Sequence, residues 1–151
     1  NNEMDDFSVK AGVPNAFGLI GGEANAIAPG KKPLSSMTPT IVLKGGKPFM
    51  AVGASGGPRI ITGTLQTLMN VIDFDMSAEA AVSMPRIHHQ WMPEKLFIER
   101  EMPQDVRQVL AAKGHSLALG GAENVVQAVV VREGHFEGAS DPRKGGRPAG
   151  Y

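Results

Sequence analysis

The feature that most constrains this chain is a glycine-rich turn at residues 53–59, which read GASGGPR. An apolar run typical of a strand precedes it at 49–52, and a helical pattern follows it. Glycine lets the backbone turn sharply, and Pro58 suits the first turn of a helix. The amides of Gly56 and Gly57 therefore lie ahead of a helix N-terminus, where they can stabilise negative charge on one oxygen, as in an oxyanion hole. The alternative interpretation is a turn that only joins strand to helix.

The pattern along the chain predicts an α+β fold with an antiparallel sheet covered by helices. Gly45-Gly46 between two β-rich runs indicates a tight hairpin. The expected strands are 40–44, 49–52, 96–98, 115–119, 125–131 and 135–137, and the expected helices are 59–72, 77–83 and 103–113. The strands are grouped as hairpins rather than alternating with helices, which argues against a parallel doubly wound sheet.

Helical spacing predicts which side chains are buried. In the helix at 59–72 the expected buried face consists of Ile61, Leu65, Leu68 and Ile72. In the helix at 103–113 the side chains expected to point inward are Val106, Val109 and Leu110.

Composition excludes several classes of protein. Lys+Arg and Asp+Glu number 15 each, so the net charge is zero and nothing favours nucleic acid as a partner. No apolar run approaches 18 residues, so no membrane span is expected. Cysteine is absent. His88 and His89 are adjacent on an extended segment and would point to opposite faces, which predicts a packed, hydrogen-bonded histidine rather than a metal site. No cofactor is expected.

Ser35 and Ser36 lie between Pro33 and Pro39. Two adjacent hydroxyls can donate hydrogen bonds to a carboxylate or a phosphate. The alternative is local bonding of serine to the backbone of a turn.

Several blocks together resemble the small subunit of the γ-glutamyltranspeptidase family, in matching order over essentially the whole chain. They are NNEMDDF at 1–7, KPLSSMTPT at 32–40, GG at 56–57, PRIHHQW at 85–91, GASDPR at 138–143 and the final GY. The resemblance implies an N-terminal-nucleophile hydrolase, whose fold is a four-layer αββα sandwich with two antiparallel sheets. Residues 1–151 would be part of that sandwich, a single-domain C-terminal portion of the small subunit.

The resemblance also implies roles for individual residues. Glu3 and Asp6 match the acids that hold the α-ammonium of a γ-glutamyl group, and Ser35 and Ser36 match the hydroxyls that hold its α-carboxylate. Gly56 and Gly57 match the oxyanion hole. The turn here reads GASGG where the family often has GSPGG, so one hydroxyl is displaced by one position.

The family's nucleophile is an N-terminal threonine whose own amine is the base, and no threonine here matches it. We therefore expect the nucleophile on a segment before Asn1, and further partners in the large subunit. Glutathione or a similar γ-glutamyl donor would be the substrate, and the location periplasmic or secreted. The isolated chain 1–151 is expected to show no turnover. The alternatives are a related acylase, such as a cephalosporin acylase or a capsule transpeptidase, and an inert binding fragment.

Overall fold

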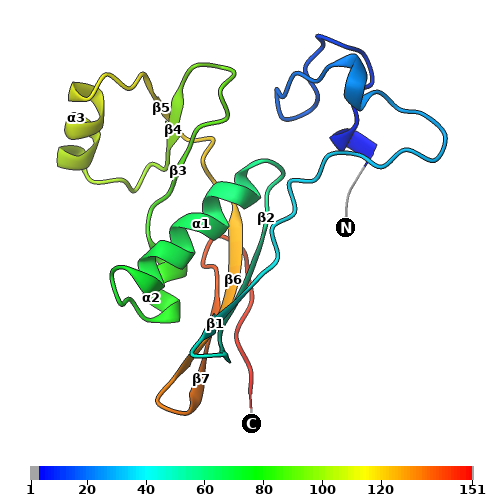
Figure 1. The fold of residues 1–151 in the computed structure, drawn as a ribbon. Helices are drawn as coiled ribbons and strands as arrows, with labels where there is room; N and C mark the ends of the chain where they lie inside the picture. Colours follow the sequence, from blue (N-terminus) through cyan, green and yellow to red (C-terminus); the bar gives the residue numbers. More distant parts are fainter. Residues whose placement is uncertain (1–3, 151) are drawn as a thin grey trace.

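A four-stranded antiparallel sheet forms the body of the protein in the computed structural model, which describes residues 4–150. The strands are β1 (Thr40–Lys44), β2 (Lys47–Ser55), β6 (Val125–Arg132) and β7 (His135–Ser140), in the order β1-β2-β6-β7. Each neighbouring pair is antiparallel, as Figure 1 shows. The α+β class and the antiparallel character of this sheet are thus confirmed.

The β1–β2 hairpin forms where the two glycines predict it. Gly45 and Gly46 have φ angles of 58° and 77°. Two successive positive φ values are the requirement of a type I′ turn, whose twist matches the twist of paired strands. Beyond the turn, β2 runs to Ser55 and delivers the chain to the glycine-rich segment.

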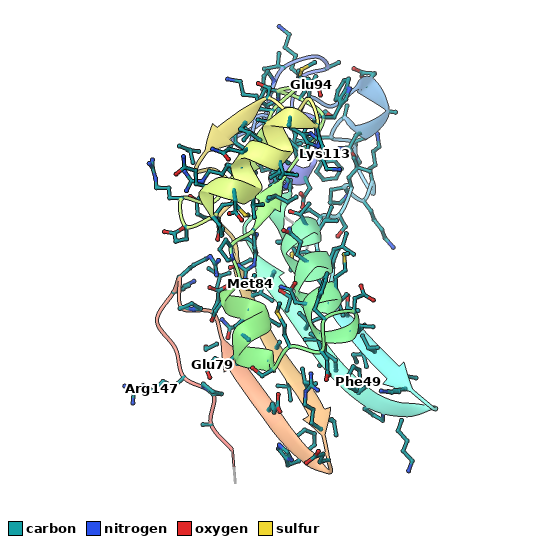
Figure 2. All side chains as sticks on the ribbon, turned by 90° about the vertical axis from the view of Figure 1, so that its left-hand side faces the viewer. Phe49, Glu79, Met84, Glu94, Lys113 and Arg147 are labelled. Atoms are coloured by element: carbon teal, nitrogen blue, oxygen red, sulfur yellow. The ribbon has the colours of Figure 1, made fainter. Side chains whose placement is uncertain are left out.

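Two helices, α1 (Arg59–Ile72) and α2 (Ala78–Ser83), cover one face of this sheet (Figure 2). The hydroxyl of Ser77 accepts a hydrogen bond from the Ala80 amide at 3.2 Å and caps α2, as the sequence predicts. The core lies between the helices and the sheet. Its buried members are Met50, Val52, Val71, Ala78, Ala81, Val82, Val126, Ala128, Val130 and Ala139.

The expected buried face of α1 is wrong for three of its four residues, and only Leu68 packs against the core. Ile61, Leu65 and Ile72 are about half exposed, whereas the side facing the sheet carries Ile60, Gly63, Thr64, Thr67 and Val71. Close packing explains the choice: a Cβ added at Gly63 would lie 2.0 Å from Asn124 Oδ1. The side of α1 with small residues such as Gly63 faces the sheet, because larger side chains would not fit at so short a distance.

Thr67 offers a test of this packing. Its side chain is fully buried, and its hydroxyl has no hydrogen-bond partner among residues 4–150. We expect Thr67→Val to raise the free energy of unfolding by about 1 kcal/mol, because it removes an unsatisfied buried polar group without changing the side chain's shape. Urea unfolding measures the change. Thr64→Val is the matched control: Thr64 is equally buried, but its hydroxyl accepts from Thr38 at 3.2 Å, so stability should not rise.

A second, smaller sheet contains β3 (Ile87–His88), β4 (Leu96–Ile98) and β5 (Leu117–Leu119). Here β4 and β5 are parallel, which the hairpin pattern does not predict. The helix α3 (Gln104–Ala112) joins them, and a helical crossover is the connection that parallel strands require.

The inward face predicted for α3 is also wrong. Val106 and Val109 are exposed, Leu110 is only partly buried, and no residue of α3 is buried. α3 packs at the edge of the small sheet and touches little else of the described chain, as its position in Figure 1 illustrates.

The segment before β1 lies beside this body and consists largely of loops (Figure 1). It contains two short 3₁₀ turns, η1 (Met4–Asp6) and η2 (Glu23–Asn25), and isolated bridges from Ser8 to Ala26 and from Pro14 to Ile20. Within residues 4–150, no helix has the length and apolar character needed to cross a bilayer.

Candidate functional site

A pocket of about 470 Å³ lies where the N-terminal loops meet the start of α1 and the end of β3. Its walls include Asp6, Ser35 and Ser36, three of the residues predicted to bind substrate. Glu3, the fourth, lies outside the described residues. The two predicted oxyanion glycines do not line the pocket, but Pro58, which directly follows them, does.

Asn25 connects the segment of the pocket that carries Asp6 to the segment that carries Ser35 and Ser36. Its Nδ2 donates to the Asp6 carbonyl at 2.7 Å, and its Oδ1 accepts from the Leu34 amide at 3.3 Å. Its own carbonyl accepts from the Ser8 amide at 3.0 Å. One side chain therefore fixes the spacing between Asp6 and the serine pair, 29 and 30 positions further along the chain.

The serine pair also shows the local bonding that was the alternative interpretation. Ser35 Oγ accepts from the Met37 amide at 3.2 Å. The segment is tied to α1 through Thr38, whose hydroxyl donates to that of Thr64 at 3.2 Å.

The glycine turn has the backbone geometry that only glycine adopts readily. Gly56 and Gly57 have φ angles of 138° and 59°. Their carbonyls accept from Arg59 and Ile60 at 3.3 and 3.1 Å, at the start of α1. Their amides therefore sit at the positive end of the helix, where a developing negative charge is favoured.

Both glycines are enclosed by other side chains. A Cβ added at Gly57 would lie 2.6 Å from the ring of Phe17, and one added at Gly56 would lie 3.0 Å from Asn124 Cβ. Phe17, from the N-terminal loops, thus covers one glycine, and Asn124 supports the other.

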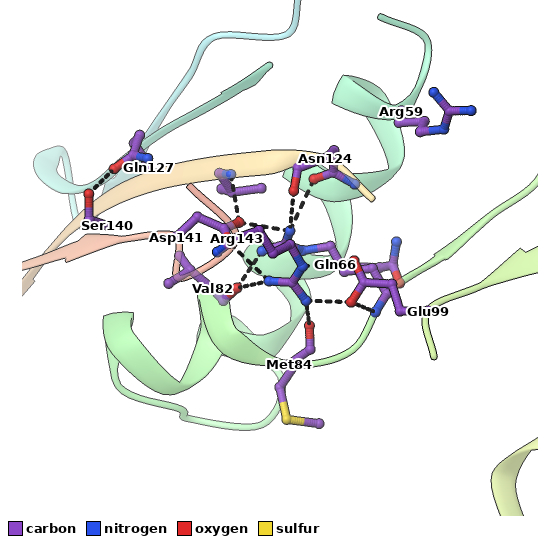
Figure 3. Close-up of polar contacts among 12 residues, drawn as sticks. Arg59, Gln66, Val82, Met84, Glu99, Asn124, Gln127, Ser140, Asp141 and Arg143 are labelled. Carbon is purple, nitrogen blue, oxygen red and sulfur yellow. Dashed lines mark hydrogen bonds and ion pairs between the residues drawn. The ribbon is translucent and has the colours of Figure 1, made fainter. Parts of the chain in front are cut away.

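Behind Asn124 lies a buried network of charged side chains, drawn in Figure 3. Arg86 donates to the backbone carbonyl and to Oδ1 of Asn124 at 3.0 and 3.2 Å, and it pairs with Asp141 at 2.8 Å. Arg143 pairs with Asp141 at 3.0 Å and with Glu99. Arg86, Glu99, Asn124 and Asp141 are each at most 3% exposed.

No role was predicted from the sequence for this network, although its two arginines lie in blocks that carry the family resemblance. One sequence pattern could have indicated it, namely charged residues next to apolar strands. Glu99 directly follows β4, and Asp141 directly follows β7. A charge at such a position is buried only when a partner neutralises it, and the partners are distant in sequence.

His88 is packed and hydrogen-bonded, as predicted. It is 2% exposed, its Nδ1 lies 2.9 Å from Thr62 Oγ1, and its Nε2 lies 2.9 Å from Gln90 Oε1. Burial lowers the pKa of His88 below its ordinary value, against the opposing effect of the Gln90 hydrogen bond. Among residues 4–150, no cluster of three or more His, Cys, Asp or Glu side chains has the arrangement of a metal site.

Comparisons with known proteins agree on one family. The gamma-glutamyltranspeptidase family model matches residues 1–151. The chain is 50% identical to a glutathione hydrolase proenzyme of Escherichia coli over 144 residues, which is 95% of this chain and 25% of that protein. It is 48% identical to the corresponding Pseudomonas proenzyme over 163 residues, 100% of this chain and 28% of that protein. The chain thus spans about a quarter of the length of these relatives.

Solved structures share its fold. A mutant of Helicobacter pylori gamma-glutamyltranspeptidase matches with a TM-score of 0.88 and 52% identity, covering 95% of this chain and 80% of that one. Cephalosporin acylase from Bacillus halodurans is more distant, with a TM-score of 0.72 and 29% identity over 79% of this chain and 23% of that one. The protein belongs to the gamma-glutamyltranspeptidase family, and its fold is that of the N-terminal-nucleophile hydrolases in this family.

Proposed function

We propose that this chain forms the part of a γ-glutamyltransferase or glutathione hydrolase that binds the glutamyl head and stabilises the oxyanion. The main support is the pocket that gathers Asp6, Ser35 and Ser36 beside Pro58, at the helix end that carries Gly56 and Gly57. The described part of the chain therefore offers an acid and two hydroxyls in one pocket, and two amides in the turn that leads to Pro58 at its wall.

These groups match the chemistry of an α-amino acid head. The carboxylate of Asp6, with that of Glu3, accepts hydrogen bonds from an α-ammonium, while Ser35 and Ser36 donate to an α-carboxylate. A zwitterion needs partners of both kinds. The scissile γ-carbonyl then extends toward the glycine turn.

The amides of Gly56 and Gly57 act when that carbonyl is attacked. A nucleophilic hydroxyl passes its proton to the neighbouring α-amine and adds to the carbon of the γ-carbonyl. The carbonyl oxygen becomes negative and is stabilised by the two N–H groups, while the proton passes on to the leaving nitrogen. Collapse expels the amine and leaves an acyl-enzyme ester, which water or an amino acid amine then attacks to release the glutamyl group. The attacking threonine belongs, in this proposal, to a segment outside residues 1–151.

Family membership supports the remaining parts of the proposal. The partners would be the remainder of the small subunit and a large subunit, joined after self-cleavage of one precursor. Residues 1–151 would be a single-domain piece that is inactive alone, and the enzyme would be periplasmic or secreted.

A test is to measure the complete gene product on a γ-glutamyl anilide and on a glutaryl anilide, which lacks the α-ammonium. We expect preference for the γ-glutamyl substrate. Asp6→Asn should lower kcat/KM for that substrate roughly 10- to 100-fold, since a charge-assisted hydrogen bond is lost, and should barely affect the glutaryl substrate. Asp105→Asn, on exposed α3, is the control and should change neither rate.

The alternative functions give different results in the same assay. The likeness to a cephalosporin acylase favours an acylase as the second candidate. An acylase, or a capsule transpeptidase without a need for the α-ammonium, would retain its rate in Asp6→Asn. An inert binding fragment would give no turnover of either anilide in the complete gene product.

A further inference from the structure

A closed ring of contacts joins the start of α1 to the loop that covers it. Thr62 on α1 bonds to His88 on β3, and His88 bonds to Gln90 just beyond that strand. Gln90 Nε2 donates to the Phe17 carbonyl at 3.0 Å. The Phe17 ring in turn lies against Gly57, two residues before the start of α1. The loop tip is therefore attached to the same helix whose N-terminus it covers.

The side-chain amide of Gln90 is fully used in this ring. Its Nε2 donates to two carbonyls, those of Phe17 at 3.0 Å and Met92 at 3.1 Å. Two carbonyl acceptors fix which end of the amide is nitrogen, so Oε1 must face His88. His88 Nε2 then carries the proton and donates at 2.9 Å, and His88 Nδ1 lies 2.9 Å from Thr62 Oγ1.

The tip of the loop is rigid within itself. Asn15 Oδ1 accepts from the amides of Phe17 and Leu19 at 3.0 and 2.9 Å, and the Asn15 carbonyl accepts from Gly18 at 2.9 Å. Asn15 Nδ2 donates to the Asp5 carbonyl, which belongs to the same N-terminal segment. The Gln90 bond differs because it ties this compact tip to the body of the protein.

We propose that Gln90 is a positioning residue: it holds the loop tip at residues 15–19 so that the Phe17 ring stays over Gly57. Asn15 and Leu19 also line the pocket that holds Asp6, Ser35 and Ser36. Gln90 itself lines this pocket, and through the loop tip it also fixes the part of the wall that Asn15 and Leu19 form. The consequence for catalysis rests on the proposed function, whereas the tether itself does not.

Hydrogen–deuterium exchange of the complete gene product tests the tether. Gln90→Met keeps the length of the side chain and removes its hydrogen bonds, so amides 15–19 should exchange roughly fivefold faster, the effect of losing one net hydrogen bond. Gln90→Glu, a second variant, keeps an acceptor for His88 and loses the donor to Phe17, so it should give the same acceleration. Gln108→Met, on exposed α3, should give none.

Unchanged exchange at 15–19 in both variants would overturn the proposal, and so would an equal acceleration in β6, because the effect would then be global. Kinetics on a γ-glutamyl anilide provide the second measurement. We expect KM to rise several-fold in Gln90→Met with kcat within about twofold, since a pocket wall is loosened and the oxyanion donors remain. If the unsubstituted protein shows no turnover, the proposed function fails, while the exchange result still decides the tether.

Discussion

Replacing Asp141 with asparagine is expected to lower the free energy of unfolding by about 3–5 kcal/mol, the usual effect of breaking a buried ion pair. Asp141 is 1% exposed and lies between Arg86 and Arg143, at 2.8 and 3.0 Å. Its carboxylate also accepts from the amides of Val126 at 2.8 Å and Arg143 at 3.0 Å. Without its charge, two arginines share one remaining carboxylate, that of Glu99 (Figure 3).

The matched control is Asp75→Asn. Asp75 also pairs with an arginine, Arg132, at 2.7 Å, but its side chain is 88% exposed. Solvent screens such a pair, so the denaturation midpoint should barely move. Urea unfolding of both variants of the complete gene product makes the comparison. Equal, small losses of stability would show that burial does not determine how much the Asp141 ion pair stabilises the fold.

The same carboxylate should make stability depend on pH. Burial alone would raise the pKa of Asp141, but hydrogen bonds from Val126 and Arg143 and the charge of Arg86 outweigh it and lower the pKa below its ordinary value. A lowered folded-state pKa stabilises the fold above the unfolded pKa of about 3.9, and that stability is lost as pH falls through the folded value. The native protein and Asp141→Asn should therefore differ less in their free energy of unfolding below about pH 4 than at neutral pH.

The network also bears on the glycine turn. Arg86 holds Asn124 by two hydrogen bonds, and Asn124 packs against Gly56 and Gly63. The charged network thus holds in place Asn124, the side chain that packs against the glycine-rich turn. Its residues lie beside the ends of β3, β4, β6 and β7, which meet only in the folded chain.

Local chemistry made much of the fold predictable from the sequence. The Gly45-Gly46 hairpin, the bounds of α1 and the Ser77 cap each depend on a few neighbouring residues, and each is confirmed. Packing over long range was not predictable in the same way. α1 has apolar residues around much of its circumference, so spacing alone did not reveal that the side with Gly63 faces the sheet.

The same distinction between local patterns and long-range contacts applies to the candidate site. Asp6, Ser35 and Ser36 were predicted from a resemblance, and the structure places all three in one pocket. Two supporting side chains had no role predicted from the sequence: Asn25, which bonds to Asp6 and Leu34, and Gln90, which bonds to Phe17. Their roles depend on hydrogen bonds to backbone groups 19 and 73 positions away, which no local pattern encodes.

Gly57→Ala should produce the largest catalytic loss. Its φ of 59° is unfavourable for alanine, and the new methyl would lie 2.6 Å from the Phe17 ring. The turn and the ring cannot both keep their places, so the two amides would move from the positions in which, under the proposed function, they stabilise the oxyanion. Removal of one oxyanion donor typically lowers kcat by about 10²- to 10³-fold, and we expect a loss of that size for a γ-glutamyl anilide.

Two further variants separate strain in the turn from collision with the ring. Gly53→Ala is the matched control: it lies in β2, nothing lies within 4 Å of its added Cβ, and its φ is ordinary, so kcat should stay near the native value. Adding Phe17→Ala to Gly57→Ala removes the collision and leaves the strained φ. Partial recovery of kcat would assign the loss to the ring, and no recovery would assign it to the backbone. Native kcat in Gly57→Ala, with rates normalised to cleaved protein, would contradict an oxyanion role for this turn.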